Sequence, residues 1–127
     1  MPYRIIWENG GLVYRFSGGV SDEDLVGATE EVNAHPLFAA MSYQIVDFSV
    51  IDTFDASSVG VRRVASMDRL ASETNPDVRV AIITSATFIR GMSRMYALGH
   101  GSEGGSWTTE VFESEEDARA WAISASA

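Results

Sequence analysis

A pair of serines at the expected start of a helix is the most suggestive chemical feature of this sequence. Residues 55–60 read Asp-Ala-Ser-Ser-Val-Gly, and apolar residues at helical spacing follow them. A serine hydroxyl at this place can cap the helix, or it can carry a phosphate that free N–H groups and the helix dipole stabilise. Arg62 and Arg63 lie one turn further on and are available as counter-charges. Capping and phosphorylation therefore both remain open for Ser57.

A stripe of methionine and aromatic side chains, with arginines beside it, is the second feature. Much of it lies on an expected helix that ends at Gly99. Methionine and aromatic side chains adapt to varied apolar shapes, and an arginine fork suits an anionic group. The stripe could line a cavity or fill the core, and both interpretations stay open. The candidate ligand-binding residues are Met67, Phe88, Arg90, Met92, Arg94, Met95, Tyr96 and Trp107.

The remaining chemical motifs favour structural roles. Residues 99–104 match G-x-G-x-x-G, but a helix precedes them and a strand follows, the reverse of a dinucleotide site, so we expect a closing loop. His35 and His100 stand apart, without a second ligand at metal-binding spacing. We expect Asp47 to be exposed at the end of its strand, because burying an unpaired carboxylate is costly. We expect no catalytic residue, cofactor or metal, and an enzyme is the third of three hypotheses.

Composition narrows the classes of partner. The chain of 127 residues has a formal net charge of −9, no cysteine, and nine basic residues that are all arginine. This charge argues against nucleic acid and does not indicate a peripheral membrane contact, since both bind through clustered positive charge. The charge is uneven, because residues 57–100 carry six arginines and three acids, or +3. An anionic and partly apolar ligand at the centre is therefore compatible with the sequence.

Length and hydropathy favour one cytoplasmic domain. A chain of this length typically forms a single domain, and we expect residues 1–127 to do so. No apolar run approaches the roughly 20 residues of a membrane span. Glu8 interrupts the N-terminal segment where a secretory signal would continue, so we expect a cytoplasmic location.

The strands expected to position these residues begin with a hairpin. Residues 3–8 and 12–17 alternate apolar and polar side chains on either side of Asn9-Gly10-Gly11, which predicts two antiparallel strands. Gly18-Gly19 is expected to end the second strand. Compact apolar or β-rich runs predict three further strands, at residues 43–49, 78–84 and 107–112.

The expected helices alternate with these later strands. They run from Ser21 to near Ala34, from Ser58 to Ser72, up to Gly99, and from Ser114 onwards. The order β-β-α-β-α-β-α-β-α predicts the α/β class, with a mixed sheet, an N-terminal hairpin and parallel interior strands.

Several stretches of this sequence resemble the SpoIIAA-like family of small bacterial proteins. The likeness runs nearly end to end, and the order of elements with DFSVIDTFDASSVGV resembles the STAS fold of anti-sigma-factor antagonists. The other similar stretches are YRIIWENGGLVYRFSGGVSDEDL, HPLFAAMSYQIVDFSVIDTF, NPDVRVAIIT and VFESEEDARAW. The resemblance implies a single STAS-like domain.

The resemblance also suggests a function. In the antagonists, the segment after the third strand reads Asp-Ser-Ser-Gly and carries a serine that a partner kinase phosphorylates, and Ser57 occupies that position here. Asp55 is kept, whereas Ala56 replaces the first serine and Ser58 replaces the glycine. The STAS fold is similar to lipid-carrying CRAL-TRIO domains, which implies an apolar or lipid-like ligand.

We therefore expect a non-enzymatic binding or regulatory module. It would hold an apolar or lipid-like anionic ligand, or a protein partner, through the second and third helices. The alternative is a regulator similar to the anti-sigma antagonists and switched by phosphorylation near Ser57.

Overall fold

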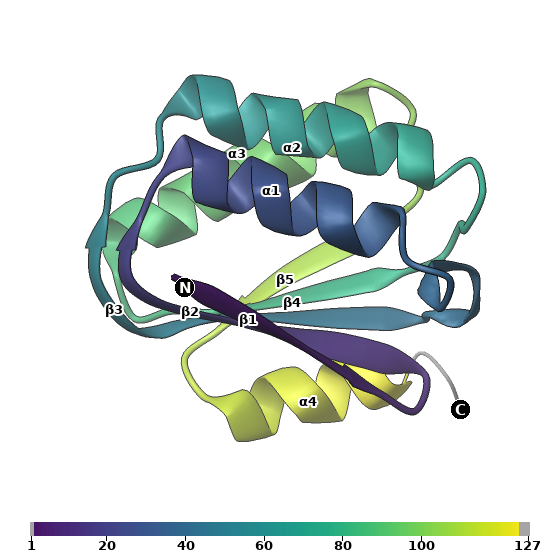
Figure 1. Cartoon of the computed structure of the whole chain (residues 1–127), viewed down its shortest axis with the longest axis horizontal. Coiled ribbons are helices and arrows are strands. Elements are labelled where there is room, and N and C mark those ends of the chain that lie inside the picture. The colour runs from purple at the N-terminus through teal and green to yellow at the C-terminus, as the bar shows by residue number, and fades with distance from the viewer. Residues whose placement is uncertain (1, 125–127) are drawn as a thin grey trace.

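A computed structural model describes residues 2–124 as a five-stranded sheet between two helical layers (Figure 1). Met1 and residues 125–127, the ends of the expected domain, lie outside this range. α1 (Asp22–Asn33), α2 (Ser58–Ala71) and α3 (Thr87–Ser102) cover one face, and α4 (Glu115–Ile123) covers the other. A short 3-10 helix, η1 (Phe38–Ala40), precedes the third strand. The strands are β1 (Tyr3–Glu8), β2 (Gly11–Val20), β3 (Tyr43–Phe54), β4 (Arg79–Ile83) and β5 (Thr108–Phe112).

The strand order across the sheet is β1-β2-β3-β4-β5. β1 and β2 form the predicted antiparallel hairpin, and all later neighbours are parallel. Parallel neighbours need a crossover, and α1, α2 and α3 each provide one over the same face of the sheet. The predicted α/β class, the hairpin and the parallel interior strands are confirmed.

Serine caps start three of the helices, as the sequence predicted. Ser21 and Asp24 form a reciprocal capping box at α1, and Ser114 accepts a hydrogen bond from the Asp117 N–H at α4. Ser57 caps α2. Each cap satisfies an N–H group that the helix itself leaves without a partner.

β2 and β3 run further than the sequence predicted. Gly18-Gly19 does not end β2 but lies at a register shift, and the strand continues to Val20. β3 passes its predicted end at Ser49 and continues to Phe54. The two strands remain paired with each other after β4 has ended, so the glycines produce a bulge instead of a terminus. Ser57 follows three residues after the end of this longer β3.

α3 is also longer than predicted, because its last turn is anchored in the core. The helix passes Gly99 and ends at Ser102, so His100 lies on the helix and not in a glycine loop. His100 is 1 % exposed, and its Nε2 accepts a hydrogen bond from the Trp107 N–H at 3.0 Å. Burial lowers the pKa of His100, which favours the neutral ring that can accept this bond. A Cβ on Gly105 would overlap the His100 ring, so the chain can pass there only as glycine.

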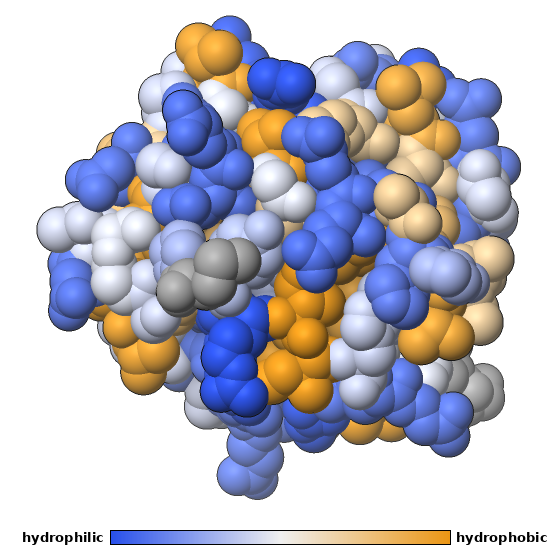
Figure 2. All heavy atoms as spheres, in the orientation of Figure 1, coloured by the Kyte–Doolittle hydropathy of each residue, from blue (hydrophilic) through white to orange (hydrophobic). Residues whose placement is uncertain are grey.

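Apolar side chains fill both faces of the sheet. The larger cluster lies between the sheet and α1, α2 and α3, and the smaller one lies under α4. Figure 2 shows one side of the molecule, where hydrophilic side chains surround an apolar band that lies where Figure 1 draws β1. None of the helices described between residues 2 and 124 has the length and apolar character of a membrane span.

Candidate functional site

Ser57 and Asp22 connect the starts of two neighbouring helices. The Ser57 hydroxyl donates a hydrogen bond to Oδ2 of Asp22, and its backbone N–H donates to Oδ1, both at 2.6 Å. Asp22 is the first residue of α1, and Ser57 directly precedes α2. Because both bonds favour the charged carboxylate, the Ser57 hydroxyl above all lowers the pKa of Asp22. One carboxylate therefore ties the start of α1 to the start of α2.

Gly60 allows this close approach. It lies on the first turn of α2, where its N–H donates to the Ser57 hydroxyl oxygen at 3.4 Å. A Cβ at this position would overlap the Asp22 carboxyl group. Any larger residue would push α2 away from Asp22, so the glycine positions the contact. Asp22 gives no functional signal in the sequence, because it has the appearance of an ordinary acidic residue in the first turn of a helix.

Ser57 is exposed and lies where a phosphate could be held. A phosphate on its oxygen would add a charge of about −1.5 to −2 and would remove the proton donated to Asp22. The new charge would face the Asp22 carboxylate at close range. Arg62 and Arg63 are exposed on α2. Phosphorylation of Ser57 would therefore act directly on the contact between α1 and α2.

A groove lies between the end of β3 and the start of α3, and Phe88, which is 59 % exposed, is one of its lining residues. Val59, which is 72 % exposed on α2, is a second exposed apolar side chain but does not line the groove. The Phe88 ring packs edge-on against Phe54, with 6.0 Å between the ring centroids. The groove has a volume of about 380 Å³ and is lined by the carboxyl-terminal half of β3 and by residues at the carboxyl ends of β4 and β5. In open parallel sheets this is the edge at which ligands bind.

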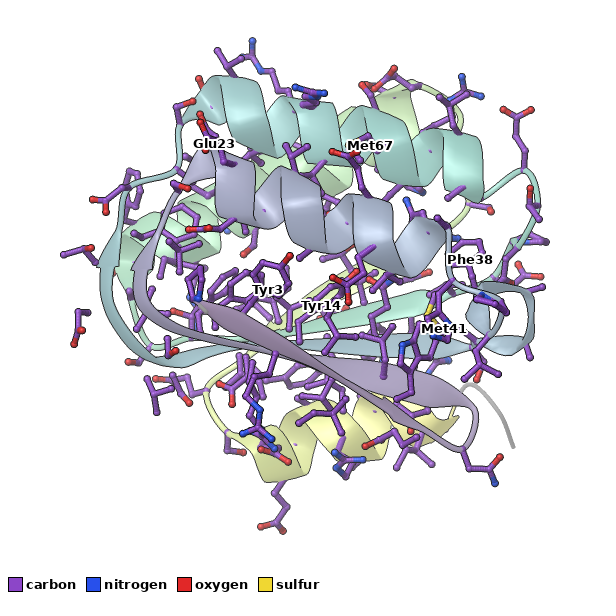
Figure 3. All side chains as sticks on the ribbon, in the orientation of Figure 1. Tyr3, Tyr14, Glu23, Phe38, Met41 and Met67 are labelled. Carbon is purple, nitrogen blue, oxygen red and sulfur yellow. The ribbon has the colours of Figure 1, made fainter. Side chains whose placement is uncertain are left out.

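A second cavity, of about 90 Å³, lies between the sheet and the three helices that cover it, and it shares Phe48, Phe54 and Ile89 with the groove. Most of the side chains around it are apolar, from β2, β3 and β4 on one side and from α1, α2 and α3 on the other. Figure 3 shows Tyr14 rising from β2 into this layer beneath α1. Tyr14, Asp68 and Tyr96 are all buried and bring polar groups to the lining.

Asp68 is a buried carboxyl group in this lining. Its oxygens accept hydrogen bonds from the Tyr96 hydroxyl at 2.7 Å and from the Asn33 amide at 3.2 Å. Burial raises the pKa of Asp68 to about 6 despite these two bonds. Asp68 is not among the candidate residues that the sequence suggested. Its helical spacing from Val61 and Ala65, both buried on α2, is the signal that could have placed it on the inner face.

The structure brings together part of the predicted ligand-binding stripe. Met92 and Tyr96 line the cavity, and Phe88 lines the groove. Met67, which Figure 3 shows on α2, and Met95 are half-buried. The remaining candidates lie apart from both spaces: Arg90 is half-buried, Arg94 is exposed, and Trp107 packs against Phe38 and His100.

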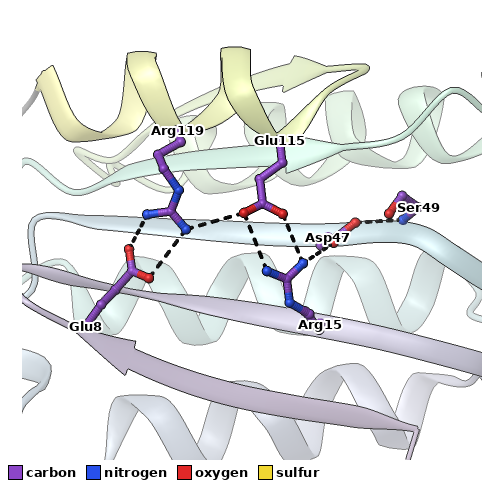
Figure 4. A network of polar contacts seen from close by, with 6 residues as sticks. All are labelled: Glu8, Arg15, Asp47, Ser49, Glu115 and Arg119. Atoms are coloured by element: carbon purple, nitrogen blue, oxygen red, sulfur yellow. Dashed lines mark hydrogen bonds and ion pairs between the residues drawn. The ribbon is translucent and has the colours of Figure 1, made fainter.

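Asp47 is buried and paired, which corrects the expectation that it would be exposed. It is 4 % exposed, and Arg15 donates to it at 2.8 Å. Arg15 also donates to Glu115 at 3.0 Å, and Arg119 pairs with the same Glu115 at 3.5 Å. Arg119 in turn donates to Glu8 at 2.6 Å, which brings β1 into the network (Figure 4). Because Arg15 pairs with Asp47, burial of this carboxylate does not carry the cost of burying an unpaired charge, on which the expectation was based. Since these bonds connect β1, β2 and β3 with α4, the network holds that helix against the sheet.

Neither histidine belongs to a cluster of potential metal ligands within residues 2–124. Within the part of the chain that the structure describes, no three His, Asp or Glu side chains gather as metal ligands would. His35 stacks on Trp7 with 4.4 Å between ring centroids, and His100 is enclosed by the core.

Comparison with known proteins identifies the fold. Neither a family model nor a curated protein matches the sequence. An uncharacterized protein of the DUF3478 family with a SpoIIAA-like fold, from Shewanella loihica PV-4, is 18 % identical, with 94 % of this chain and 91 % of that chain covered and a TM-score of 0.53.

Two structures of SpoIIAA match over 94 % of this chain and 97 % of theirs. The anti-sigma factor antagonist SpoIIAA in its unphosphorylated form is 16 % identical, with a TM-score of 0.59. The Bacillus cell fate determinant SpoIIAA in the phosphorylated form is 17 % identical, with a TM-score of 0.60. The chain therefore has the SpoIIAA-like, STAS-like fold that its sequence predicted.

Proposed function

We propose that this chain is a non-enzymatic, cytoplasmic regulatory module that binds a protein partner at the surface around Ser57. Phosphorylation of Ser57 would switch that binding. The observation that carries the proposal is the exposed Ser57 side chain, whose hydroxyl donates its proton to Asp22 at 2.6 Å. A phosphate at this oxygen would exchange an attractive contact for a repulsive one, and would thereby alter the surface on which the partner lies.

The structural neighbours support this proposal. SpoIIAA is described as an anti-sigma factor antagonist, and its structures represent an unphosphorylated and a phosphorylated form. Those properties belong to SpoIIAA. They suggest what the Ser57 position could do here, because this chain has the same fold and its sequence resemblance implies that Ser57 stands at the phosphorylated position of the antagonists.

The surface around Ser57 suggests the chemistry of the partner. Val59 and Phe88 offer exposed apolar area, while Asp52 and Asp55 are exposed acids in the same region. Interfaces combine apolar anchors with complementary charge. The surrounding surface carries both signs of charge, because Arg62 and Arg63 are also exposed on α2. The proposed partner therefore presents apolar side chains to Val59 and Phe88.

Phosphosite mapping tests the switch. The chain would be isolated from cells of its own host, during growth and after starvation, and its phosphopeptides mapped by mass spectrometry. We expect phosphate on Ser57 in one of these states, lost in Ser57→Ala and kept in the matched Ser58→Ala chain. Phosphate at the same level in the Ser57→Ala chain would contradict the proposal.

A bound apolar ligand is a second candidate function. The observation in its favour is the cavity beside Met92 and Tyr96, which lies under α1, α2 and α3. Xenon enters apolar cavities of suitable size, so ¹²⁹Xe NMR of the whole chain tests whether this space is accessible. A xenon shift indistinguishable from that of buffer would rule out this second function and leave the proposed switch untouched.

A further inference from the structure

The interior cavity has a polar end that would select the chemistry of its ligand. This inference rests on the second candidate function. We infer that the cavity takes a small apolar molecule ending in a hydrogen-bond donor, a primary amine or an alcohol, and that Asp68 accepts that donor.

The size and the lining of the cavity set the apolar part of such a ligand. Since a cavity of about 150 Å³ binds benzene, a volume of about 90 Å³ suits a molecule of about four or five non-hydrogen atoms. Phe16, Val46, Ile82 and Met92 are among the side chains around it. Water forms few hydrogen bonds with such apolar walls, whereas a branched hydrocarbon group would pack against them.

The Asp68 carboxyl group sets the polar part. An ionised carboxylate offers about four lone-pair sites, and the Tyr96 hydroxyl and the Asn33 amide use two of them. Within residues 2–124, no salt bridge includes Asp68. A buried carboxylate without a cation is stabilised by an additional donor, and most strongly by an ammonium group.

The same carboxyl group disfavours an anionic ligand. Two negative charges repel strongly in a water-poor interior. The arginines that the sequence suggested for an anionic head group, Arg90 and Arg94, lie outside the cavity lining. Tyr14, which is 5 % exposed, and Gln44, which is 3 % exposed, add neutral polar groups to the lining. The cavity therefore differs from the anion site that the arginine-rich centre of the chain suggested.

Three probes with one carbon skeleton test this chemistry on the unaltered chain. Isobutylamine, isobutanol and isobutyrate would be titrated at pH 8 and followed by the ¹H-¹⁵N spectrum, with ¹²⁹Xe as the purely apolar reference. We expect the amine or the alcohol to shift the amide signals of Tyr14, Asp68 and Tyr96. Isobutyrate should bind at least about tenfold more weakly than the better donor. A stronger response to the amine identifies an ammonium ligand, and a stronger response to the alcohol identifies a hydroxyl ligand.

Two variants separate the role of Asp68 from that of the cavity. Asp68→Asn should weaken binding of the better donor probe at least about tenfold while xenon still enters. Glu116→Gln makes the same chemical change on exposed α4 and should change neither. The inference would be overturned if isobutyrate bound as tightly as the donor probes, or if Asp68→Asn bound the better donor probe as tightly as the unaltered chain does. In either case, entry of xenon would still support the existence of a cavity. The comparison of the three probes needs no variant, so the test holds even if Asp68→Asn fails to fold.

Discussion

The Asp22 carboxylate accepts both the hydroxyl proton and the backbone N–H of Ser57, each at 2.6 Å. The two residues are 35 positions apart in the sequence and stand at the starts of neighbouring helices. Ser57 therefore caps its own helix and also fastens it to another. A change at its hydroxyl acts on both roles at once.

Removing the Ser57 hydroxyl should lower the stability of the folded chain. Ser57→Ala loses the cap of α2 and one of the two bonds to Asp22, so we expect the free energy of unfolding to fall by about 1 kcal/mol. Urea unfolding at pH 7 measures this difference. The neighbouring Ser58→Ala variant should change it by less than about 0.5 kcal/mol. Equal losses in the two variants would show that the cap is not at Ser57.

The space around Gly60 provides a second prediction. Gly60→Ala places a methyl group against the Asp22 carboxylate, so we expect a loss of about 1–3 kcal/mol in the free energy of unfolding. Gly91→Ala is the matched control, because a Cβ there meets nothing within 4 Å and the residue lies within α3. The control should be stabilised by up to about 1 kcal/mol. A Gly60→Ala chain as stable as Gly91→Ala would refute the described approach of α2 to Asp22.

The sequence predicts those features of the fold that depend on local patterning. Alternation on both sides of Asn9-Gly10 predicts the hairpin, and the serines before α1, α2 and α4 predict the helix starts, because these signals act over a few residues. Gly18-Gly19 led to a wrong prediction of the end of β2, because the end of this strand depends on a distant partner and not on local residues. The continued pairing of β2 with β3 decides where the strand ends, and that partner is more than 30 residues away.

The candidate site depends even more on distant partners. Ser57 can be picked out from its place before a helix, but Asp22 cannot, because only the packing of α1 beside α2 brings the two together. Asp47 is buried since Arg15 reaches it from the neighbouring strand. The position of Asp68 could have been predicted, because its helical spacing from the apolar residues of α2 places it on the buried face. A carboxyl group on such a face indicates a buried polar contact.

Asp68 should make stability depend on pH. Its pKa is about 6 in the folded chain and 3.8 as the ordinary value, so between these limits the folded state binds more protons than the unfolded state. The free energy of unfolding therefore falls as pH rises through this window. Asp68→Asn removes this dependence. Relative to the unaltered chain, we expect the variant to gain up to about 3 kcal/mol between pH 4 and pH 7.5.

Urea unfolding of both chains at the two pH values measures that gain. Glu116→Gln serves as the control, because Glu116 is exposed on α4 and should show little change. A difference between Asp68→Asn and the unaltered chain that stays constant from pH 4 to pH 7.5 would contradict the raised pKa of Asp68.

The network under α4 leads to a fourth prediction. Asp47→Asn weakens the bond to Arg15 in a buried place, so we expect a loss of about 1–2 kcal/mol in the free energy of unfolding. Glu73→Gln disrupts an exposed i,i+4 pair with Arg69 and should cost less than about 0.5 kcal/mol. Urea unfolding at pH 7 compares the two, and similar losses would mean that the buried network contributes no more than a surface pair.

Site-specific photo-crosslinking beside Ser57 tests the proposed function most directly. A benzophenone amino acid would replace Val59 in the chain expressed in its own host, with the same group at Glu116 on α4 as the control. We expect a protein adduct from Val59 that is absent from Glu116 and is lost when Ser57→Glu introduces a negative charge beside Asp22. An adduct that forms equally from both positions, or that persists unchanged in the Ser57→Glu chain, would contradict a partner surface switched at Ser57.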